Sequence, residues 1–99
     1  MKVQILRPAL RDMHSSYRFY ERQDLGLGSY FRECIDQDLI SLQATAGIHS
    51  LHRGYHHVRS EIFQSIIYYR IIFNKAVVFA ILDARISPQT RDQILSRRY

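Results

Sequence analysis

The chain has 99 residues, which is enough for a single domain, 1–99, and too few for two. Hydrophobic residues make up 46% of it and charged residues 23%, a composition that excludes a disordered chain. The net charge is +5, and the excess lies in residues 50–99, which hold eight Lys/Arg against three Asp/Glu. Such an asymmetry favours an anionic partner, nucleic acid or an acidic protein segment, over a neutral one, with a solvated basic surface as the alternative.

The number of cysteines and the length of the apolar stretches limit the cellular location of the protein and the kinds of metal or disulfide site it can contain. Cys34 is the single cysteine, which excludes an internal disulfide and a cysteine-based zinc site. The first residues lack the apolar run of a signal peptide, and the longest apolar stretches, about eight residues, are too short to span a bilayer. We therefore expect a cytoplasmic protein without a membrane partner.

The N-terminal part of the chain reads as a strand followed by a helix. Val3 and Ile5 alternate with polar residues, which predicts a short strand at 2–6. Pro8 suits a first helical turn, and apolar residues recur after it at spacings of three and four. This pattern predicts an amphipathic helix over 8–23.

A second helix should follow a short break. Residues 24–28 contain two glycines, which provide the backbone freedom of a tight helix–helix connection. The next helix is predicted at 29–45, with Ser29 as its cap and Gly47 ending it. Because the connection is short, the two helices should pack as an antiparallel hairpin. The apolar face of the second helix is formed by Phe31, Ile35, Leu39 and Leu42.

The period then changes to that of β-structure. A polar strand is predicted at 52–59, a strand rich in β-formers at 62–73 and an apolar strand at 76–82, with residues 74–75 as a two-residue turn. The last two strands should form a hairpin at the centre of the sheet, and Pro88 should start a short final helix. The order predicts an α+β fold: an N-terminal strand, a helix hairpin packed on a mainly antiparallel sheet, and a short C-terminal helix.

Four residue groups carry information beyond the order of elements. In chain order they are Ala9-x-x-Asp12-Met13 with Phe19-Tyr20-Glu21, Gly26-Leu27-Gly28-x-x-Phe31, Val58-Arg59 with Phe63 and Tyr69, and Val78 to Ala84 with Arg85-x-x-Pro88. Together they resemble the RelE/ParE toxins, the small basic halves of bacterial type II toxin–antitoxin systems. The match extends over nearly the whole chain, and its glycine junction and Arg-x-x-Pro tail are more similar to ParE than to RelE.

A ParE-like resemblance implies a toxin of a plasmid-stabilisation system. Such a toxin inhibits growth by binding DNA gyrase, needs no cofactor, and works through an interface and not through an active site. Guanidinium groups would make multidentate contacts with carboxylates or phosphates of the target. The expected target-binding residues are Arg59, Arg70, Arg85, Arg91 and Arg98.

The resemblance also implies a cognate antitoxin that wraps the toxin with a helix and an extended segment. Helix-in-groove binding and strand addition both suit a small α+β domain. A homodimer, or a heterotetramer with the antitoxin, is left open. The expected antitoxin contacts, for which core packing is the alternative, are Leu10, Tyr17, Leu25, Leu27 and Tyr30.

A RelE-like ribosome-dependent mRNA endonuclease is the alternative function. Arg59 and Arg85, facing one concave surface, would stabilise the charge on the phosphorane, and His57 or a neighbouring histidine or tyrosine would transfer protons. Solvated or packed histidines are the competing interpretation. Two departures weaken this alternative: the lysine pair of RelE nucleases is not evident, and there is no clear RelE-type tail tyrosine, since Tyr99 is the terminal residue.

A third alternative is a non-toxic binding module or decayed toxin. It is kept open by Gln64-Ser65, which stand where the family usually has Pro-Tyr. A metal site is not expected. In one continuous strand His52 and His56 would lie about 13 Å apart, too far to share a tetrahedral ion.

Overall fold

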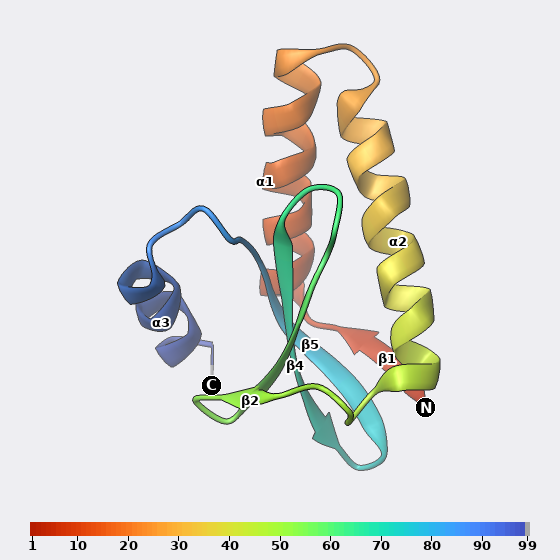
Figure 1. Cartoon of the computed structure of the whole chain (residues 1–99), viewed down its shortest axis with the longest axis vertical. Coiled ribbons are helices and arrows are strands. Elements are labelled where there is room, and N and C mark those ends of the chain that lie inside the picture. The colour runs from red at the N-terminus through yellow and green to blue at the C-terminus, as the bar shows by residue number, and fades with distance from the viewer. Residues whose placement is uncertain (99) are drawn as a thin grey trace.

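The computed structural model describes residues 1–98, and Tyr99 lies outside the described residues. Its elements are β1 (Lys2–Ile5), α1 (Arg7–Gln23), α2 (Leu27–Thr45), β2 (Leu51–His52), β3 (Tyr55–Arg59), β4 (Ser65–Ile72), β5 (Lys75–Asp83) and α3 (Pro88–Ser96) (Figure 1). Within the described part of the chain, five strands form one sheet in the order β1-β5-β4-β3-β2. β1 runs parallel to β5, and the other neighbours are antiparallel. The predicted α+β architecture is confirmed.

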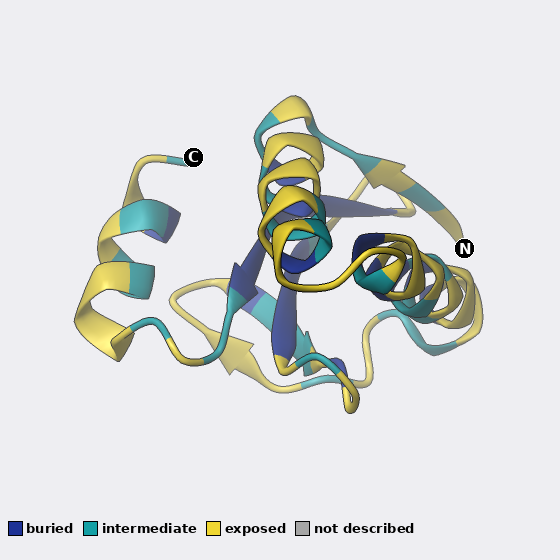
Figure 2. Ribbon diagram, turned by 90° about the horizontal axis from the view of Figure 1, so that it is seen from above, coloured by how far each residue is buried: buried dark blue, intermediate teal, exposed yellow. Residues whose placement is uncertain are grey.

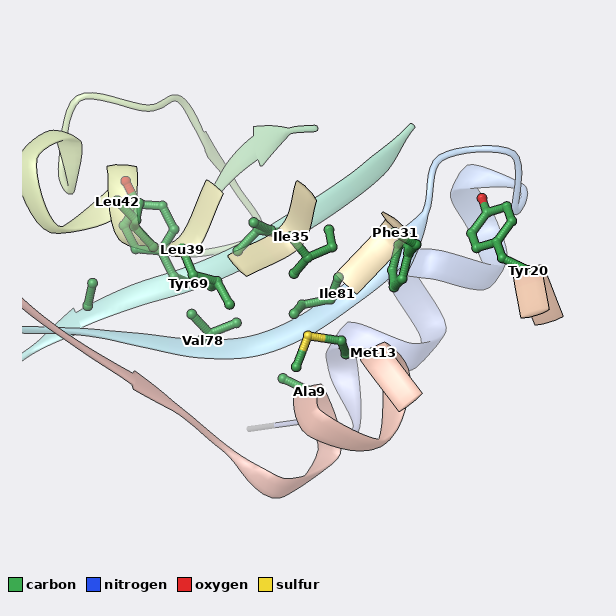
Figure 3. Close-up of a cluster of buried hydrophobic side chains, with 12 residues drawn as sticks. Ala9, Met13, Tyr20, Phe31, Ile35, Leu39, Leu42, Tyr69, Val78 and Ile81 are labelled. Carbon is green, nitrogen blue, oxygen red and sulfur yellow. The ribbon is translucent and has the colours of Figure 1, made fainter. Parts of the chain in front are cut away.

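Helices cover both faces of the sheet. The α1–α2 hairpin packs on one face and α3 on the other, so the central strands β4 and β5 are buried over most of their length, as predicted (Figures 1 and 2). The core under the hairpin includes Met13, Phe31, Ile35, Leu42, Tyr69 and Val78 (Figure 3). The core on the α3 side includes Tyr55, Tyr68, Phe79 and Leu95.

The junction between the helices differs from the prediction. The second helix begins at Leu27, and its N-cap is Gly26 with φ of 90°, so Ser29 lies inside the helix and does not cap it. The reason is a side chain from the preceding helix. The Glu21 carboxylate accepts hydrogen bonds from the N–H groups of Gly26, at 3.0 and 3.1 Å, and of Gly28, at 3.0 Å. These bonds satisfy donors that a local Ser cap would otherwise serve.

Gly28 is required by the close approach of α1 and α2. A Cβ atom at this position would lie 2.6 Å from the carbonyl oxygen of Tyr17, which is closer than van der Waals contact permits. The absence of a side chain therefore sets how tightly the hairpin closes.

The polar strand predicted at 52–59 is wrong in detail, because the chain turns in its middle. Arg53 and Gly54 both have positive φ, 53° and 80°, and His52 pairs with Tyr55 across a two-residue turn. The segment is therefore a hairpin of β2 and β3. The separation of about 13 Å expected between His52 and His56 assumed one continuous strand. It does not apply, because the two residues lie on neighbouring antiparallel strands.

The β4–β5 turn lies one residue earlier than predicted. Phe73 and Asn74 occupy it with φ of 48° and 59°, and Ile72 pairs with Lys75. β4 itself starts at Ser65, later than the composition indicated, because Gln64 adopts φ of 53° and ends the preceding turn.

A carboxylate on α1 connects three elements. β1 pairs with β5 as far as Val78, so the N–H of Ile81 has no strand partner on that side, and it donates to Asp12 Oδ2 at 3.0 Å. The Arg98 guanidinium donates to both oxygens of Asp12, at 2.8 and 2.9 Å, and to the carbonyl oxygen of Phe79 at 2.9 Å. The Asp12–Arg98 pair thus fixes the end of α3 to α1 and β5.

Replacing Arg98 should destabilise the fold because it leaves the Asp12 carboxylate without its cation in a mostly buried position. We expect Arg98→Met to lower the free energy of unfolding by about 2–3 kcal/mol. Urea unfolding followed by circular dichroism measures this change, and Arg97→Met is the matched control because Arg97 is exposed. Equal effects of the two substitutions would contradict a structural role for the pair.

Candidate functional site

A hollow of about 390 Å³ lies between β3, β4 and the N-terminal half of α3. Pro88, Arg91 and Asp92 of α3 form one wall, so its shape depends on where α3 is held. The strand side of the hollow is formed by His52, His57, Arg59, Ile66 and Tyr68.

Two groups in the hollow have no hydrogen-bond partner among the described residues. Arg59, the last residue of β3, is exposed, and its guanidinium has no hydrogen-bond or ion-pair partner within residues 1–98. The Nδ1 atom of His57 is buried without a hydrogen-bond partner. The His57 ring lies 6.3 Å from that of Tyr68, centroid to centroid. A buried polar atom without a partner costs free energy, so the exposed Arg59 guanidinium is the group that a ligand in the hollow can reach directly.

The α3 wall is held by its own polar contacts. Arg91 donates from Nη1 to the carbonyl oxygens of Ala84, at 2.9 Å, and Ile86, and so fixes the segment that leads into α3. Asp92 contacts His52 Nε2 at 2.8 Å and Arg53 Nε at 3.1 Å. The hydrogen bond from His52 and the charge of Arg53 hold the pKa of Asp92 below its ordinary value. Asp92 is therefore ionised near neutral pH and is not suited to act as a general acid.

Arg85 does not share the hollow of Arg59. Its guanidinium forms an ion pair with Asp83 at 2.7 Å and donates to the Tyr20 hydroxyl at 3.3 Å. Hydrogen bonds from Arg85 hold the pKa of Asp83 below its ordinary value. Arg85 lines a separate, smaller hollow together with Tyr20 and Phe63. The structure therefore does not bring Arg59 and Arg85 to one concave surface, because Asp83, two residues earlier, holds Arg85 elsewhere.

Arg70 and Arg98, expected among the target-binding residues, have structural contacts. The Arg70 guanidinium lies 4.4 Å from the ring centroid of Tyr55 and 5.5 Å from that of Phe79, in the core on the α3 side. Such cation–π packing stabilises a cation away from water. Arg98 is engaged with Asp12. No local sequence pattern indicates either partner, because these contacts join residues far apart along the chain.

The expected antitoxin contacts lie on the helix hairpin with different exposure. Leu25, in the connection, is 91% exposed, and Tyr30 and Leu10 are about half exposed. Tyr17 and Leu27 are half-buried and pack against the core under the hairpin. The hairpin thus offers an apolar surface near its connection, while Tyr17 and Leu27 also serve the core.

Four of the five histidines fall into two groups, and His14 lies apart from them on α1. His52 and His57 line the hollow, whereas His49 and His56 surround Tyr69. The Tyr69 hydroxyl accepts from the N–H of Gly47 at 2.9 Å and lies 2.6 Å from His49 Nδ1. Which of the two groups donates in this second contact depends on the tautomer of His49. Burial, followed by the charges of neighbouring histidines, lowers the pKa of His49.

Neither a metal site nor a membrane-spanning helix is found within residues 1–98. No group of three or more His, Cys, Asp or Glu side chains is arranged to hold a metal ion. No helix in this part of the chain has the length and hydropathy needed to cross a membrane.

Comparisons with known proteins give a structural match only. No protein-family model and no curated protein sequence matches the chain. Among solved structures, it is similar to a chain of the "Chromosomal ParDE TA system from P. aeruginosa", with a TM-score of 0.72 and 17% identity. The match covers 86% of this chain and 97% of that one. The predicted RelE/ParE-like fold is thereby confirmed.

The environment of His49 predicts how stability depends on pH. Because the pKa of His49 is lowered in the folded state, the unfolded chain binds protons more strongly. The stability that this residue contributes is therefore complete above the ordinary histidine pKa of about 6.5 and falls as pH decreases below it. Urea unfolding at neutral and mildly acidic pH measures the effect. His49→Gln should reduce the pH dependence, whereas His14→Gln, at an exposed position on α1, should leave it unchanged. An unaltered pH profile in His49→Gln would refute the assignment.

Proposed function

We propose that this protein is the toxin of a type II toxin–antitoxin system, that it inhibits bacterial growth by binding DNA gyrase, and that a cognate antitoxin neutralises it. The observation that carries the proposal is the likeness in fold, over nearly the full length of both chains, to a chain of a ParDE toxin–antitoxin system. The ParE-like glycine junction and Arg-x-x-Pro tail in the sequence support the same branch of the family. The toxin would act in the cytoplasm, in a plasmid-stabilisation or chromosomal system.

The distribution of charged groups supports binding over catalysis. A nuclease needs a base, an acid and cations around one phosphate. Here Arg59 and Arg85 line separate hollows, and Arg85 is paired with Asp83. Asp92, the carboxylate in the hollow, has a lowered pKa. An interface needs only exposed cations and apolar surface, and Arg59 and the half-exposed Arg85 provide cations for it.

Cleavage of ribosome-bound mRNA is the second candidate, and one observation favours it. His57 and Arg59 line the same hollow. His57 would take the proton from a ribose 2′-hydroxyl, whose oxygen attacks the adjacent phosphorus while the 5′-oxygen leaves, and Arg59 would stabilise the phosphorane. The leaving 5′-oxygen must also be protonated, and for this step the candidate requires a general acid other than His57 and Arg59.

Expression of the chain from a tightly repressed promoter in bacteria tests the proposal. We expect growth arrest with filamentation and DNA breaks. Arg59→Ala and Arg85→Ala should each restore growth, because truncating an interface arginine weakens binding about tenfold or more. Arg32→Ala is the charge-matched control, since Arg32 is exposed on α2 and paired only with Asp36 within residues 1–98.

Other outcomes select the other candidates. Cut messages on stalled ribosomes, abolished by His57→Ala, would establish the nuclease and contradict gyrase binding. Unimpaired growth with a folded, soluble product would identify a binding module or a decayed toxin. Arrest that neither arginine substitution relieves would refute the assignment of Arg59 and Arg85.

A further inference from the structure

The outer face of α1 carries a continuous row of basic side chains. They recur at spacings of four, three, four and four residues, so at about 100° per residue they fall within an arc of about 80° on the helix surface. All of them are exposed. We call this surface the basic stripe, and it consists of Arg7, Arg11, His14, Arg18 and Arg22.

The basic stripe is opposite the face by which α1 packs on the sheet. The buried residues of this helix, Ala9, Met13 and Tyr20, lie about half a turn around the helix axis from the centre of the stripe. Figure 2 shows exposed residues along the side of α1 that is turned away from the strands. The stripe therefore takes no part in the core, and its side chains are available to a partner.

The two carboxylates of α1 do not neutralise the stripe, because both are engaged elsewhere. Asp12 accepts hydrogen bonds from Arg98 and from the N–H of Ile81. Glu21 accepts from two N–H groups at the start of α2. Within residues 1–98, the four guanidinium groups of the stripe form no hydrogen bond or ion pair. The balance of charge in residues 1–49, six Lys/Arg against six Asp/Glu, thus hides an unneutralised cationic surface.

The length of the stripe suits a partner with regularly repeated charges. Arg7 and Arg22 are 15 residues apart on one uninterrupted helix, which corresponds to about 22 Å along its axis. Over this distance each strand of a DNA duplex carries a phosphate about every 3.4 Å of its axis. Guanidinium groups bind phosphate oxygens through paired hydrogen bonds. A helix already held by the core can therefore contact several phosphates without the cost of ordering a flexible segment.

The side chains within the arc favour the backbone of a duplex over other anionic partners. A protein interface has an apolar centre, whereas every position of α1 within the arc carries a basic side chain. A helix at a membrane surface buries its apolar face in the bilayer, whereas that of α1 is buried in the core. Single-stranded nucleic acid stacks its bases on aromatic rings, and the ring within the arc, His14, is stacked with Tyr17 at a centroid distance of 6.3 Å.

We propose that the basic stripe binds the phosphate backbone of double-stranded DNA without regard to its sequence, with the four arginines as the phosphate contacts. The choice of DNA over duplex RNA rests on the proposed function, because gyrase acts on duplex DNA. The Arg59 hollow is bounded by α3, which covers the other face of the sheet. One molecule can therefore contact DNA and a protein target at the same time.

The test measures binding of the purified chain to a fluorescein-labelled DNA duplex of mixed sequence by fluorescence anisotropy, between about 50 and 200 mM salt. Four phosphate contacts predict that the logarithm of the binding constant falls with the logarithm of the salt concentration, with a slope of about −3 to −4. The double substitution Arg11→Gln with Arg18→Gln should reduce the size of this slope by about two and weaken binding about tenfold or more at the lower salt concentration. Amide shifts in ¹⁵N spectra of the unsubstituted chain should map DNA binding to residues 7–22.

The double substitution Arg32→Gln with Arg97→Gln is the matched control, because it removes the same charge from exposed positions outside the stripe. It should leave the slope nearly unchanged. Glutamine is a good helix former, and circular dichroism of both double variants separates a loss of binding from a loss of folding.

The proposal is overturned if the chain does not bind the DNA duplex, if both double variants weaken binding equally, or if the amide shifts map elsewhere. Tighter binding to duplex RNA, to single-stranded DNA or to phosphatidylglycerol vesicles than to the DNA duplex would also overturn it. Because gyrase is absent from this assay, these outcomes are independent of whether the chain inhibits gyrase.

Discussion

The position of α3 depends on the carboxylate of Asp12. This group accepts a hydrogen bond from the N–H of Ile81, beyond the end of β1, and two from the guanidinium of Arg98. The Tyr55 hydroxyl adds a hydrogen bond to the carbonyl oxygen of Leu95 at 3.0 Å. Because α3 provides one wall of the hollow that contains Arg59, these remote contacts act together with those of Arg91 and Asp92 to position that wall. Stability and the shape of the candidate site therefore depend in part on the same contacts.

The sequence predicted what local periodicity determines. Spacings of three and four gave both helices of the hairpin, and dense β-formers gave the central strands. The predicted positions of the second helix cap and of the turns were wrong, because these positions depend on interactions between residues that the local pattern does not show. Glu21 satisfies the N–H groups at the start of α2, and Arg53 and Phe73 accept left-handed conformations that neither residue type favours.

The candidate site was predicted in composition and not in arrangement. The excess of arginine in the second half of the chain was evident, but each arginine's partner is set by the fold. Arg98 meets Asp12, 86 residues away in the sequence, and Arg70 packs on Tyr55. The structure leaves Arg59 open and pairs Arg85 with Asp83. Within residues 1–98 the fold thus leaves one of the two predicted arginines open and pairs the other, which local sequence patterns could not indicate.

We propose that the protein acts by binding gyrase. The decisive experiment adds the purified chain to purified DNA gyrase and relaxed plasmid DNA, with a reconstituted translation reaction run in parallel. We expect loss of supercoiling, accumulation of cleaved plasmid bound to gyrase, and intact messenger RNA. Normal supercoiling together with cut messenger RNA would contradict it.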